Sequence, residues 1–389
     1  MKPVLFHDFL VRMGGAEHVL FTFSTIFPEA PIYTFFYDEE KVEHTYPGLS
    51  KRIIPHPVGQ RLYDIFKRIP FLSLYTTKLF VRIFPHLVEQ IDLHSYDFIL
   101  ANSTAWAHGL VPPSDAKFIV YMNSPMRFVW DWFNEYKYEL GAKKHTHWKN
   151  IVLTWLLSKV RIWDQIALKK ESILLCNSKT IQKRIEKFYK RTDAILLYPP
   201  VDVRDIPMPQ AHAEHDGYFI VISTLTKYKR IDIVIDLFNK IGKPLLIVGD
   251  GPYGEYLRLR SEKNITFAGY VSKVKKFELL SKARALIFPT EDDFGIVPIE
   301  ALAAGKPVIA LRKGGAREYV VPGVTGEFFE EQNSQSLEKA IAQFLSREEE
   351  FDPKVLRMKA ETFSTEAFLK NFKSIMKTQL HIDLSSKNF

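Results

Sequence analysis

The sequence predicts an α/β protein made of two doubly wound parallel-sheet domains. Short apolar runs typical of buried strands alternate with helical stretches, and this alternation occurs twice along the chain. Residues 203–216, polar and with two prolines, separate the two series and are typical of a linker. At 389 residues the chain is also too long for one comfortable hydrophobic core. We therefore expect a first domain at 1–205, a second at 217–364, and a helix at about 365–380 that can pack back on the first domain.

Composition excludes several classes of protein. Hydrophobic residues make up 46% of the chain and charged residues 25%, which is typical of a globular protein. No apolar run approaches the roughly 18–20 residues that cross a bilayer, and the N-terminus becomes polar too soon for a signal peptide. Because Cys176 is the only cysteine, an internal disulfide is excluded, a structural zinc is not expected, and we predict a cytoplasmic location.

The net charge of +8 is concentrated in the first half of the chain. Residues 1–205 carry 27 Lys/Arg and 21 Asp/Glu, a balance of +6, and residues 136–191 alone carry 14 and 4. Such a surface attracts anions, which include nucleic acid, an anionic membrane or a phosphorylated acceptor.

Residues 51–90 mix basic and aromatic side chains, with seven Lys/Arg against only Asp64 and Glu89. This mixture is typical of a surface that lies on an anionic leaflet, so we predict peripheral association with the inner face of the cytoplasmic membrane. A domain core whose helices have solvated basic faces is an equally open interpretation. Single-stranded nucleic acid could use the same pattern by stacking, but no RNA-binding signature accompanies it, and we expect no nucleic-acid partner.

The first domain is predicted to open with a strand at 4–6, the glycine pair Gly14-Gly15, and a helix over about 16–26. A strand, a glycine turn and a helix together make an anion-binding mouth, although tight turns use the same glycine pair. The other expected elements of this domain are strands at 97–100, 118–121, 172–177 and 194–197, and amphipathic helices from about 149 to 170.

The loop 122–131 follows a predicted strand and lacks the periodicity of a core segment. It contains Asn123, Arg127, Trp130 and Asp131. Ligand-contacting groups tend to lie after the carboxyl ends of parallel strands, so this loop is a candidate binding segment.

The second domain is predicted to repeat the alternation. The expected elements are strands at 218–222, 245–248 and 265–271, and helices at 231–238, 274–281 and about 366–377. A strongly basic loop at 224–230 follows the first of these strands. His212 and His215 of the preceding linker are better interpreted as solvated side chains than as metal ligands.

The stretch 287–325 organises the second domain. Its order is strand, acidic loop, glycine, short helix, glycine stop and strand, which is one compact parallel β-α-β unit. The free amides at the start of the helix favour a phosphate, whereas the carboxylates of Asp292 and Glu300 suit sugar hydroxyls. A sugar nucleotide carries both groups. The alternative is an ordinary β-α-β unit with a solvated acidic loop.

Taken together, the motifs resemble the retaining glycosyltransferases of family 4, which have the GT-B fold of two Rossmann-like domains facing a central cleft. Within that family the chain is most similar to the O-antigen and exopolysaccharide mannosyltransferases. The ordered marks of the resemblance are Gly14 to Glu17, Tyr121 to Asp131, Asn177-Ser178, Lys229 to Asp232, Gly249 to Pro252, Asp292 to Glu300, Gly314-Gly315, Glu318 and Gly323 to Gly326.

The resemblance implies which residues would bind the donor diphosphate. Gly14 and Gly15 would let the backbone approach it, and Lys229 with Arg230 would neutralise it. Fixed cations there stabilise the charge that grows on the leaving group. Because these groups supply the positive charge, neither a metal nor another cofactor is expected.

The resemblance also implies contacts to the rest of the donor. The amides of Phe294, Gly295 and Ile296 would hold phosphate or sugar, and Glu300 the ribose hydroxyls. Asp292 would hold the sugar hydroxyls without acting as a nucleophile, and Asn123 would act beside it. Contacts to the base would come from Tyr270 and Val271, and contacts to the acceptor from Arg127, Trp130 and Asp131.

Three positions depart from the family pattern. Asp292 stands where Glu is usual, Thr224 where a diphosphate-binding Arg is usual, and Asn123 where His is usual. Asn123 can hydrogen-bond a sugar hydroxyl but cannot titrate near neutral pH.

The expected reaction is therefore transfer of a hexose, with mannose from GDP-mannose as first choice, to a lipid-linked or polysaccharide glycan. The alternatives are another nucleotide-sugar enzyme of this fold, such as a UDP-sugar transferase or an epimerase, and a degenerate protein that binds sugar nucleotides without catalysis. A dinucleotide-dependent dehydrogenase is disfavoured because no G-x-G-x-x-G follows any predicted strand.

Overall fold

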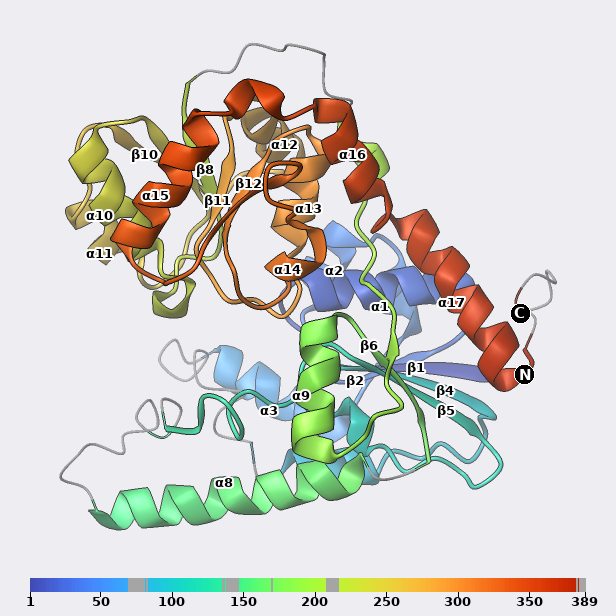
Figure 1. Ribbon diagram of the computed structural model, residues 1–389. Helices are drawn as coiled ribbons and strands as arrows, with labels where there is room; N and C mark the ends of the chain where they lie inside the picture. The colour runs from blue at the N-terminus through green and yellow to red at the C-terminus, as the bar shows by residue number, and fades with distance from the viewer. Residues whose placement is uncertain are drawn as a thin grey trace. The chain divides into compact units, whose positions relative to one another are not determined.

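The computed structural model describes residues 1–68, 81, 83–134, 137, 147–168, 171–207, 217–382 and 384. These residues form two compact units, described separately below. The N-terminal unit comprises Met1–Tyr198 with Asn371–Phe389, and the C-terminal unit comprises Pro199–Lys370. Figure 1 shows their helices and strands in chain order.

A seven-stranded sheet in which every pairing is parallel organises the N-terminal unit. Its strand order is β3-β2-β1-β4-β5-β6-β7, so the direction of winding reverses between β1 and β4. Ligands of such sheets bind outside the carboxyl ends of the strands at this reversal. The strands are β1 (Pro3–Leu10), β2 (Ile32–Tyr37), β3 (Ile53–Pro55), β4 (Phe98–Ser103), β5 (Lys117–Met122), β6 (Ile173–Cys176) and β7 (Ile195–Leu196).

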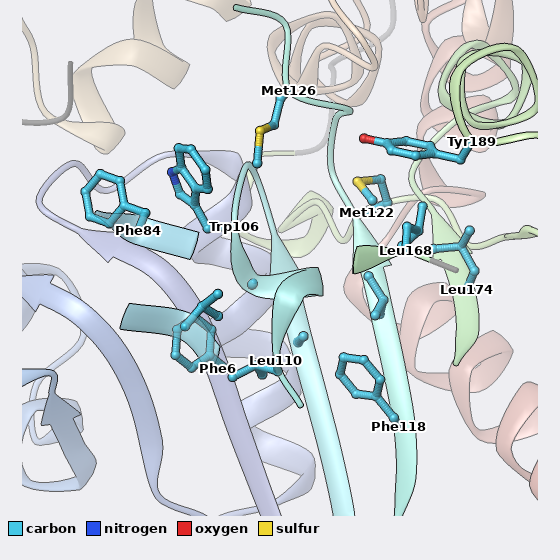
Figure 2. Close-up of a cluster of buried hydrophobic side chains, with 14 of the residues drawn as sticks. Phe6, Phe84, Trp106, Leu110, Phe118, Met122, Met126, Leu168, Leu174 and Tyr189 are labelled. Atoms are coloured by element: carbon cyan, nitrogen blue, oxygen red, sulfur yellow. The ribbon is translucent and has the colours of Figure 1, made fainter. Parts of the chain in front are cut away.

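Helices on both faces cover this sheet. They are α1 (Gly15–Ile26), α2 (Glu39–Thr45), α3 (Pro57–Lys67), α6 (Phe84–Glu89), α8 (His147–Ala167) and α9 (Lys179–Tyr189), with short 3₁₀ turns η1 (Leu49–Arg52) and η2 (Ala107–Gly109). Figure 2 shows part of the core on one face, where Phe6, Phe84 and Trp106 gather beside Met122 and Tyr189. Burial of these large side chains supplies the main favourable free energy of folding.

The C-terminal unit repeats the plan with six parallel strands in the order β10-β9-β8-β11-β12-β13. Here the winding reverses between β8 and β11, and the loops that follow these two strands are the basic loop and the acidic loop. The strands are β8 (Phe219–Ile222), β9 (Leu245–Val248), β10 (Ile265–Gly269), β11 (Leu286–Phe288), β12 (Val308–Leu311) and β13 (Gly326–Phe329).

The helices of this part of the chain lie mostly between consecutive strands. They are α10 (Ile231–Ile241), α11 (Gly254–Leu259), α12 (Lys273–Lys282), α13 (Ile296–Ala303), α14 (Ala316–Tyr319), α15 (Ser334–Leu345), α16 (Pro353–Glu361) and α17 (Thr365–Leu380). The 3₁₀ turns are η3 (Val203–Asp205), η4 (Lys227–Lys229) and η5 (Glu348–Glu350).

The fold class predicted from the sequence is confirmed, since both sheets are parallel and doubly wound. Three strands, β2, β3 and β13, are additions to the predicted set. The first strand is eight residues long instead of three, because the polar His7 and Asp8 continue it as buried residues.

The boundary between the units lies earlier than the expected linker. Val203, inside that linker, is buried in the C-terminal unit, where its carbonyl accepts a hydrogen bond of 2.9 Å from the Arg357 guanidinium. The same guanidinium donates to the carbonyls of Ile206 and Ala303 at 2.8 and 2.9 Å. Residues 208–216, which include His212 and His215, lie outside the described residues.

The last helix, α17, begins in the C-terminal unit and ends in the N-terminal unit. Phe372 of this helix is fully buried and meets Phe23 of α1 edge-on, with 4.9 Å between ring centroids. Within the described part of the chain, no helix combines the length and the hydropathy needed to cross a bilayer.

We expect Phe372→Ala to lower the free energy of unfolding by about 3 kcal/mol, because it removes a fully buried ring and leaves a cavity. The measurement is the thermal unfolding midpoint. Lys373→Ala, on the exposed side of the same helix, is the matched control and should shift the midpoint little. Equal midpoints for the two variants would contradict the packing of α17 against α1.

Candidate functional site in the C-terminal unit

The basic loop after β8 is held in place by two glycines of the neighbouring loop. Gly249 has a φ of +122°, and a Cβ on it would lie 2.0 Å from the carbonyl oxygen of Ser223. A Cβ on Gly251 would lie 2.5 Å from the carbonyl oxygen of Leu225. Only glycine allows this approach, and the backbone bond from Leu225 to Asp250 at 3.0 Å closes it. The loop then turns through η4 and presents Lys229.

The acidic loop after β11 is held in the same way. A Cβ on Gly314 would lie 2.1 Å from the Asp292 carbonyl oxygen, and one on Gly315 would lie 2.2 Å from that of Phe294. The Gly315 amide donates to the Asp292 carbonyl at 2.8 Å, and the Tyr319 hydroxyl donates to the Phe294 carbonyl at 2.9 Å. The glycine pair therefore fixes the backbone on both sides of Asp293.

Lys229 and Asp292 meet across the winding reversal of the sheet. The Lys229 ammonium donates to Oδ1 and Oδ2 of Asp292 at 2.8 and 2.6 Å, although 63 residues separate the two in the sequence. Thr290 adds a weaker hydroxyl contact to Oδ1 at 3.4 Å. Both charged side chains remain partly exposed, at 14% and 21%. One ligand can therefore reach the cation and the carboxylate together.

Helix α13 begins directly after the acidic loop. Its N-cap is Gly295, with a φ of +87°, and no side chain caps the first turn. The first turn also lacks an acidic residue that would compete for its amides. Phe294 is buried against Tyr319 and Phe363, so the backbone that leads into the helix is fixed. The amides from Phe294 to Ile296 lie at the positive end of the helix dipole.

Glu300 lies one turn into α13 and is 92% buried, since its relative exposure is 8%. Its Oε1 accepts a hydrogen bond of 2.6 Å from the Lys276 ammonium of α12, while its buried Oε2 has no hydrogen-bond partner among the described residues. A buried carboxylate oxygen without a donor is costly, so this atom is a strong candidate acceptor for a ligand hydroxyl. The partner Lys276 was missed by sequence reasoning, because nothing in its spacing marks it.

The remaining donor-side residues are placed less closely together. Arg230 has a left-handed φ of +53°, and its guanidinium contacts Asp232 at 3.2 Å. Tyr270, directly after β10, is 88% exposed, and Val271 is half-buried. These positions leave the Tyr270 ring accessible at a strand end.

Candidate functional residues in the N-terminal unit

In the glycine turn after β1, the Gly14 amide is hydrogen-bonded to a carboxylate of the same turn. Gly14 is the N-cap of α1, and its N–H donates to Glu17 Oε2 at 2.9 Å. Neither Gly14 nor Gly15 has a positive φ. Glycine is therefore not required here by the backbone conformation, and Glu17 engages the amide that the family resemblance gives to a diphosphate.

A chain of hydrogen bonds joins this turn to Asn123. His7 contacts Glu17 Oε1 through Nε2 at 3.4 Å and the Asn102 carbonyl through Nδ1 at 2.9 Å. The Asn123 amide donates to Asn102 Oδ1 at 2.6 Å. The four side chains come from the ends of β1, α1, β4 and β5. Sequence reasoning found Asn123 but missed the other three, because their partners are distant in the chain.

The His7 imidazole is completely buried. Burial alone would lower its pKa, but the hydrogen bond to Glu17 and the charges of Glu17 and Asp8 outweigh burial, so the pKa of His7 is raised above 6.5.

Asp8 is a second buried acid that sequence reasoning missed. Its carboxylate is fully buried and accepts from the amides of residues 104–107 at 2.6 to 2.9 Å, and from the Thr104 hydroxyl at 2.7 Å. All of its charge is met by donors, so Asp8 anchors the loop after β4 rather than offering a free group.

The expected acceptor-side residues do not converge on one point in the described contacts. The Trp130 indole donates to the buried Asp164 at 2.7 Å and stacks on Phe188, so Trp130 is part of the core. Asp131 is hydrogen-bonded by Arg184. The Arg127 guanidinium lies over the Trp132 ring, 4.8 Å from its centroid.

Two further features of the described residues concern a metal and a hollow. Groups of three or more metal-ligating side chains are absent from the described residues. An open hollow of about 740 Å³ lies at the amino ends of β5 and β6, lined by residues such as Lys117 and Arg191. The hollow therefore lies at the opposite edge of the sheet from Asn123, which follows the carboxyl end of β5. Ligands of such sheets bind at the carboxyl ends of the strands, so this hollow is not taken as the site.

The raised pKa of His7 predicts a pH dependence of stability. A raised folded-state pKa stabilises the fold fully below about pH 6.5, and this contribution is lost as pH rises through the folded-state value. We expect His7→Gln to remove that part of the fall in the thermal midpoint above pH 6.5. The exposed His44→Gln is the control. An unchanged slope in the His7 variant would contradict the charged His7–Glu17 contact.

Comparison with known proteins relates the C-terminal unit to a family of glycosyltransferases. The Glycosyl transferases group 1 family model matches residues 202–362. An uncharacterized glycosyltransferase of Methanocaldococcus jannaschii is 28% identical over 197 residues, which cover 49% of this chain and 54% of that protein. The O-antigen chain mannosyltransferase C of Escherichia coli is 25% identical over 142 residues, which cover 34% of this chain and 38% of that protein. The matches thus span about half or less of the length of these curated relatives.

The likeness to solved structures extends over both units. The crystal structure of Anabaena HepE in complex with UDP has a TM-score of 0.68 and 17% identity, and the match covers 97% of this chain and 100% of that one. At this identity the match shows the fold. The chain therefore has the GT-B fold, and residues 202–362 match the Glycosyl transferases group 1 family model.

Proposed function

We propose that the chain is a retaining glycosyltransferase that moves a hexose from a sugar nucleotide to a glycan acceptor. The observation that carries the proposal is the Lys229–Asp292 pair, because it places a cation and a hydroxyl acceptor within 2.6 Å of one another at the winding reversal. In a sugar diphosphate, the charged phosphates and the sugar hydroxyls are only a few atoms apart, so one ligand can contact both side chains of the pair. The pair can exchange its mutual contact for contacts to such a ligand.

The charges in the pair define a division of roles. Negative charge grows on the leaving diphosphate as the sugar–phosphate bond breaks, and Lys229 with the first amides of α13 stabilises this charge more than the ground state. Asp292 accepts hydrogen bonds from the sugar hydroxyls and orients the ring. We propose that it is not a nucleophile, that the phosphate takes the acceptor proton, and that the reaction is metal-independent.

Glu300 is proposed to bind the ribose. Its buried Oε2 has no donor among the described residues, while the hydrogen bond from Lys276 to Oε1 holds the carboxyl group in place. A ribose hydroxyl would satisfy that oxygen. Tyr270 and Val271 are proposed to meet the base, and Arg230 to add positive charge near the diphosphate.

The donor is proposed to be GDP-mannose, and a UDP-sugar is the alternative. The E. coli relative is named as a mannosyltransferase, which favours mannose. The Anabaena structure was solved with UDP and also with UDP-glucose, which favours the alternative. Thermal-shift measurements with GDP-, UDP- and ADP-sugars distinguish these donors, because a ligand that binds the folded state raises the midpoint.

The acceptor is proposed to be a lipid-linked glycan at the inner face of the cytoplasmic membrane. Part of the basic aromatic region 51–90 supports this, since Val58 and Ile65 of α3 are half-exposed, at 49% and 48%. Another part belongs to the core or to ion pairs, as Tyr63 stacks on Phe36 and Lys67 binds Asp38 at 2.9 Å. Residues 69–80 and 82 of this region lie outside the described residues.

We expect Glu300→Gln to weaken binding of the preferred sugar nucleotide about 10- to 100-fold, because a charged hydrogen-bond acceptor is replaced by a neutral one. Calorimetric titration measures the affinity. Glu338→Gln, an exposed acid paired with Lys240 in the same unit, is the control and should leave the affinity unchanged. Identical titrations for Glu300→Gln and wild type would rule out the ribose contact.

We expect Lys229→Ala to reduce turnover by at least 100-fold, because it removes charge stabilisation of the leaving diphosphate. Lys240→Ala removes an exposed lysine of α10 and is the matched control. The readout is release of nucleoside diphosphate in the presence of acceptor. Full activity of the Lys229 variant would remove the role assigned to this residue.

A further inference from the structure

Helix α8 has an apolar stripe on the side that faces away from its own unit. Figure 1 shows the helix as one uninterrupted element of 21 residues. The residues of the stripe are Trp148, Ile151, Val152, Trp155, Ile162 and Ile166, whose exposures range from 46% to 70%. Their spacings of three, four and seven residues place them on one face of the helix. A globular protein rarely leaves a contiguous apolar patch of this kind uncovered.

The opposite side of the same helix is fully packed. Leu157, Val160 and Ala167 are at most 4% exposed and lie in the core of the N-terminal unit. Trp163 is fixed by a 2.8 Å hydrogen bond from its indole to Glu89. Because one face is already committed to the protein, the stripe is a second apolar surface, which folding of this unit does not explain.

The helix that carries the stripe is basic. Residues 147–168 contain three basic residues, Lys149, Lys159 and Arg161, and one acid, Asp164, which is fully buried. Lys159 is the one charged residue within the stripe, and the Lys149 and Lys159 ammonium groups lie 5.5 and 5.8 Å from the ring centroids of Trp148 and Trp155. Both ammonium groups thus lie over tryptophan rings of the stripe, where they add positive charge to its apolar surface.

We propose that α8 lies flat in the headgroup region of an anionic bilayer, with the stripe inserted and the lysines on lipid phosphates. The combination of tryptophans, β-branched residues and lysines on an amphipathic helix suits this interface. At about 1.5 Å per residue, the helix would cover about 30 Å of membrane surface. The buried opposite face keeps the helix parallel to the surface of its unit and prevents it from spanning the bilayer.

A second copy of the chain is the other occupant that an apolar stripe can accept. A two-fold contact would place Lys159 and its basic surroundings against the same positive surface of the copy. Like charges across an interface are unfavourable, whereas an anionic lipid surface neutralises them. Charge complementarity therefore favours the membrane.

This inference deepens the proposed function, since it names the surface that would bring the enzyme to a lipid-linked acceptor. The inference depends on the proposed function only for the reason why the protein would bind a membrane. The stripe belongs to the N-terminal unit, and the proposed donor residues Lys229, Asp292 and Glu300 belong to the C-terminal unit. Membrane binding and donor binding can therefore fail independently.

The test is co-sedimentation of the full chain with vesicles of phosphatidylglycerol and phosphatidylcholine, compared with vesicles of phosphatidylcholine alone. We expect binding only to the anionic vesicles, weakened by salt. The triple variant Ile151→Ser, Trp155→Ser, Ile162→Ser should bind at least tenfold more weakly. The matched control, Leu259→Ser, Val274→Ser, Met358→Ser, changes three exposed apolar residues of the C-terminal unit and should bind as wild type does.

A second variant tests the charges alone. Lys149→Gln with Lys159→Gln should lower anionic-vesicle binding by about fivefold per lysine and reduce its salt dependence. The thermal unfolding midpoint without ligand should stay close to that of wild type in both α8 variants, which shows that they are folded. Conversely, Glu300→Gln should bind vesicles normally even if the donor assignment fails.

Two results would overturn the inference. One is equal vesicle binding by wild type and the stripe variant. The other is absence of wild-type binding to anionic vesicles, whether or not sedimentation velocity reveals a dimer that the stripe variant loses.

Discussion

The ion pair between Lys229 and Asp292 is the constraint on which the candidate site depends. Solvent-accessible ion pairs contribute little to the free energy of folding, so this pair matters mainly because of where it lies. It joins the loop after β8 to the loop after β11 at the point where the winding of the sheet reverses. Two glycine pairs on the flanking loops, at 249/251 and 314/315, remove the side chains that would otherwise push these loops apart.

The two units differ in charge at the helix starts that lie beside their winding reversals. In the C-terminal unit the first turn of α13 has no carboxylate, whereas in the N-terminal unit Glu17 binds the Gly14 amide at the first turn of α1. Glu17 also contacts His7, so the Gly14 amide and the Glu17 carboxylate already have partners within this turn. Judged by the contacts within each unit, the first turn of α13 is therefore more available to an anion than the first turn of α1.

Much of the fold could be predicted from the sequence, because the strands that carry the site are apolar runs followed by glycine or polar residues. Two of the three missed strands lack the apolar run that marks the others. β3 is Ile-Ile-Pro and ends at a proline, and β13 begins with glycine and glutamate. Of the site, Lys229, Asp292 and Glu300 were found through motifs, but Lys276, His7 and Asp8 were not. Their roles depend on contacts with residues 10 to 99 positions away, which no local pattern reports.

The Arg357 guanidinium has a practical consequence for dissecting this chain. Because it binds the carbonyls of Val203 and Ile206, the first residues of the expected linker are an integral part of the second Rossmann-like fold. An isolated C-terminal half that starts at residue 217 would strand a buried cation with two of its three carbonyl acceptors gone. A C-terminal half that is expressed as a separate polypeptide should therefore begin at Pro199.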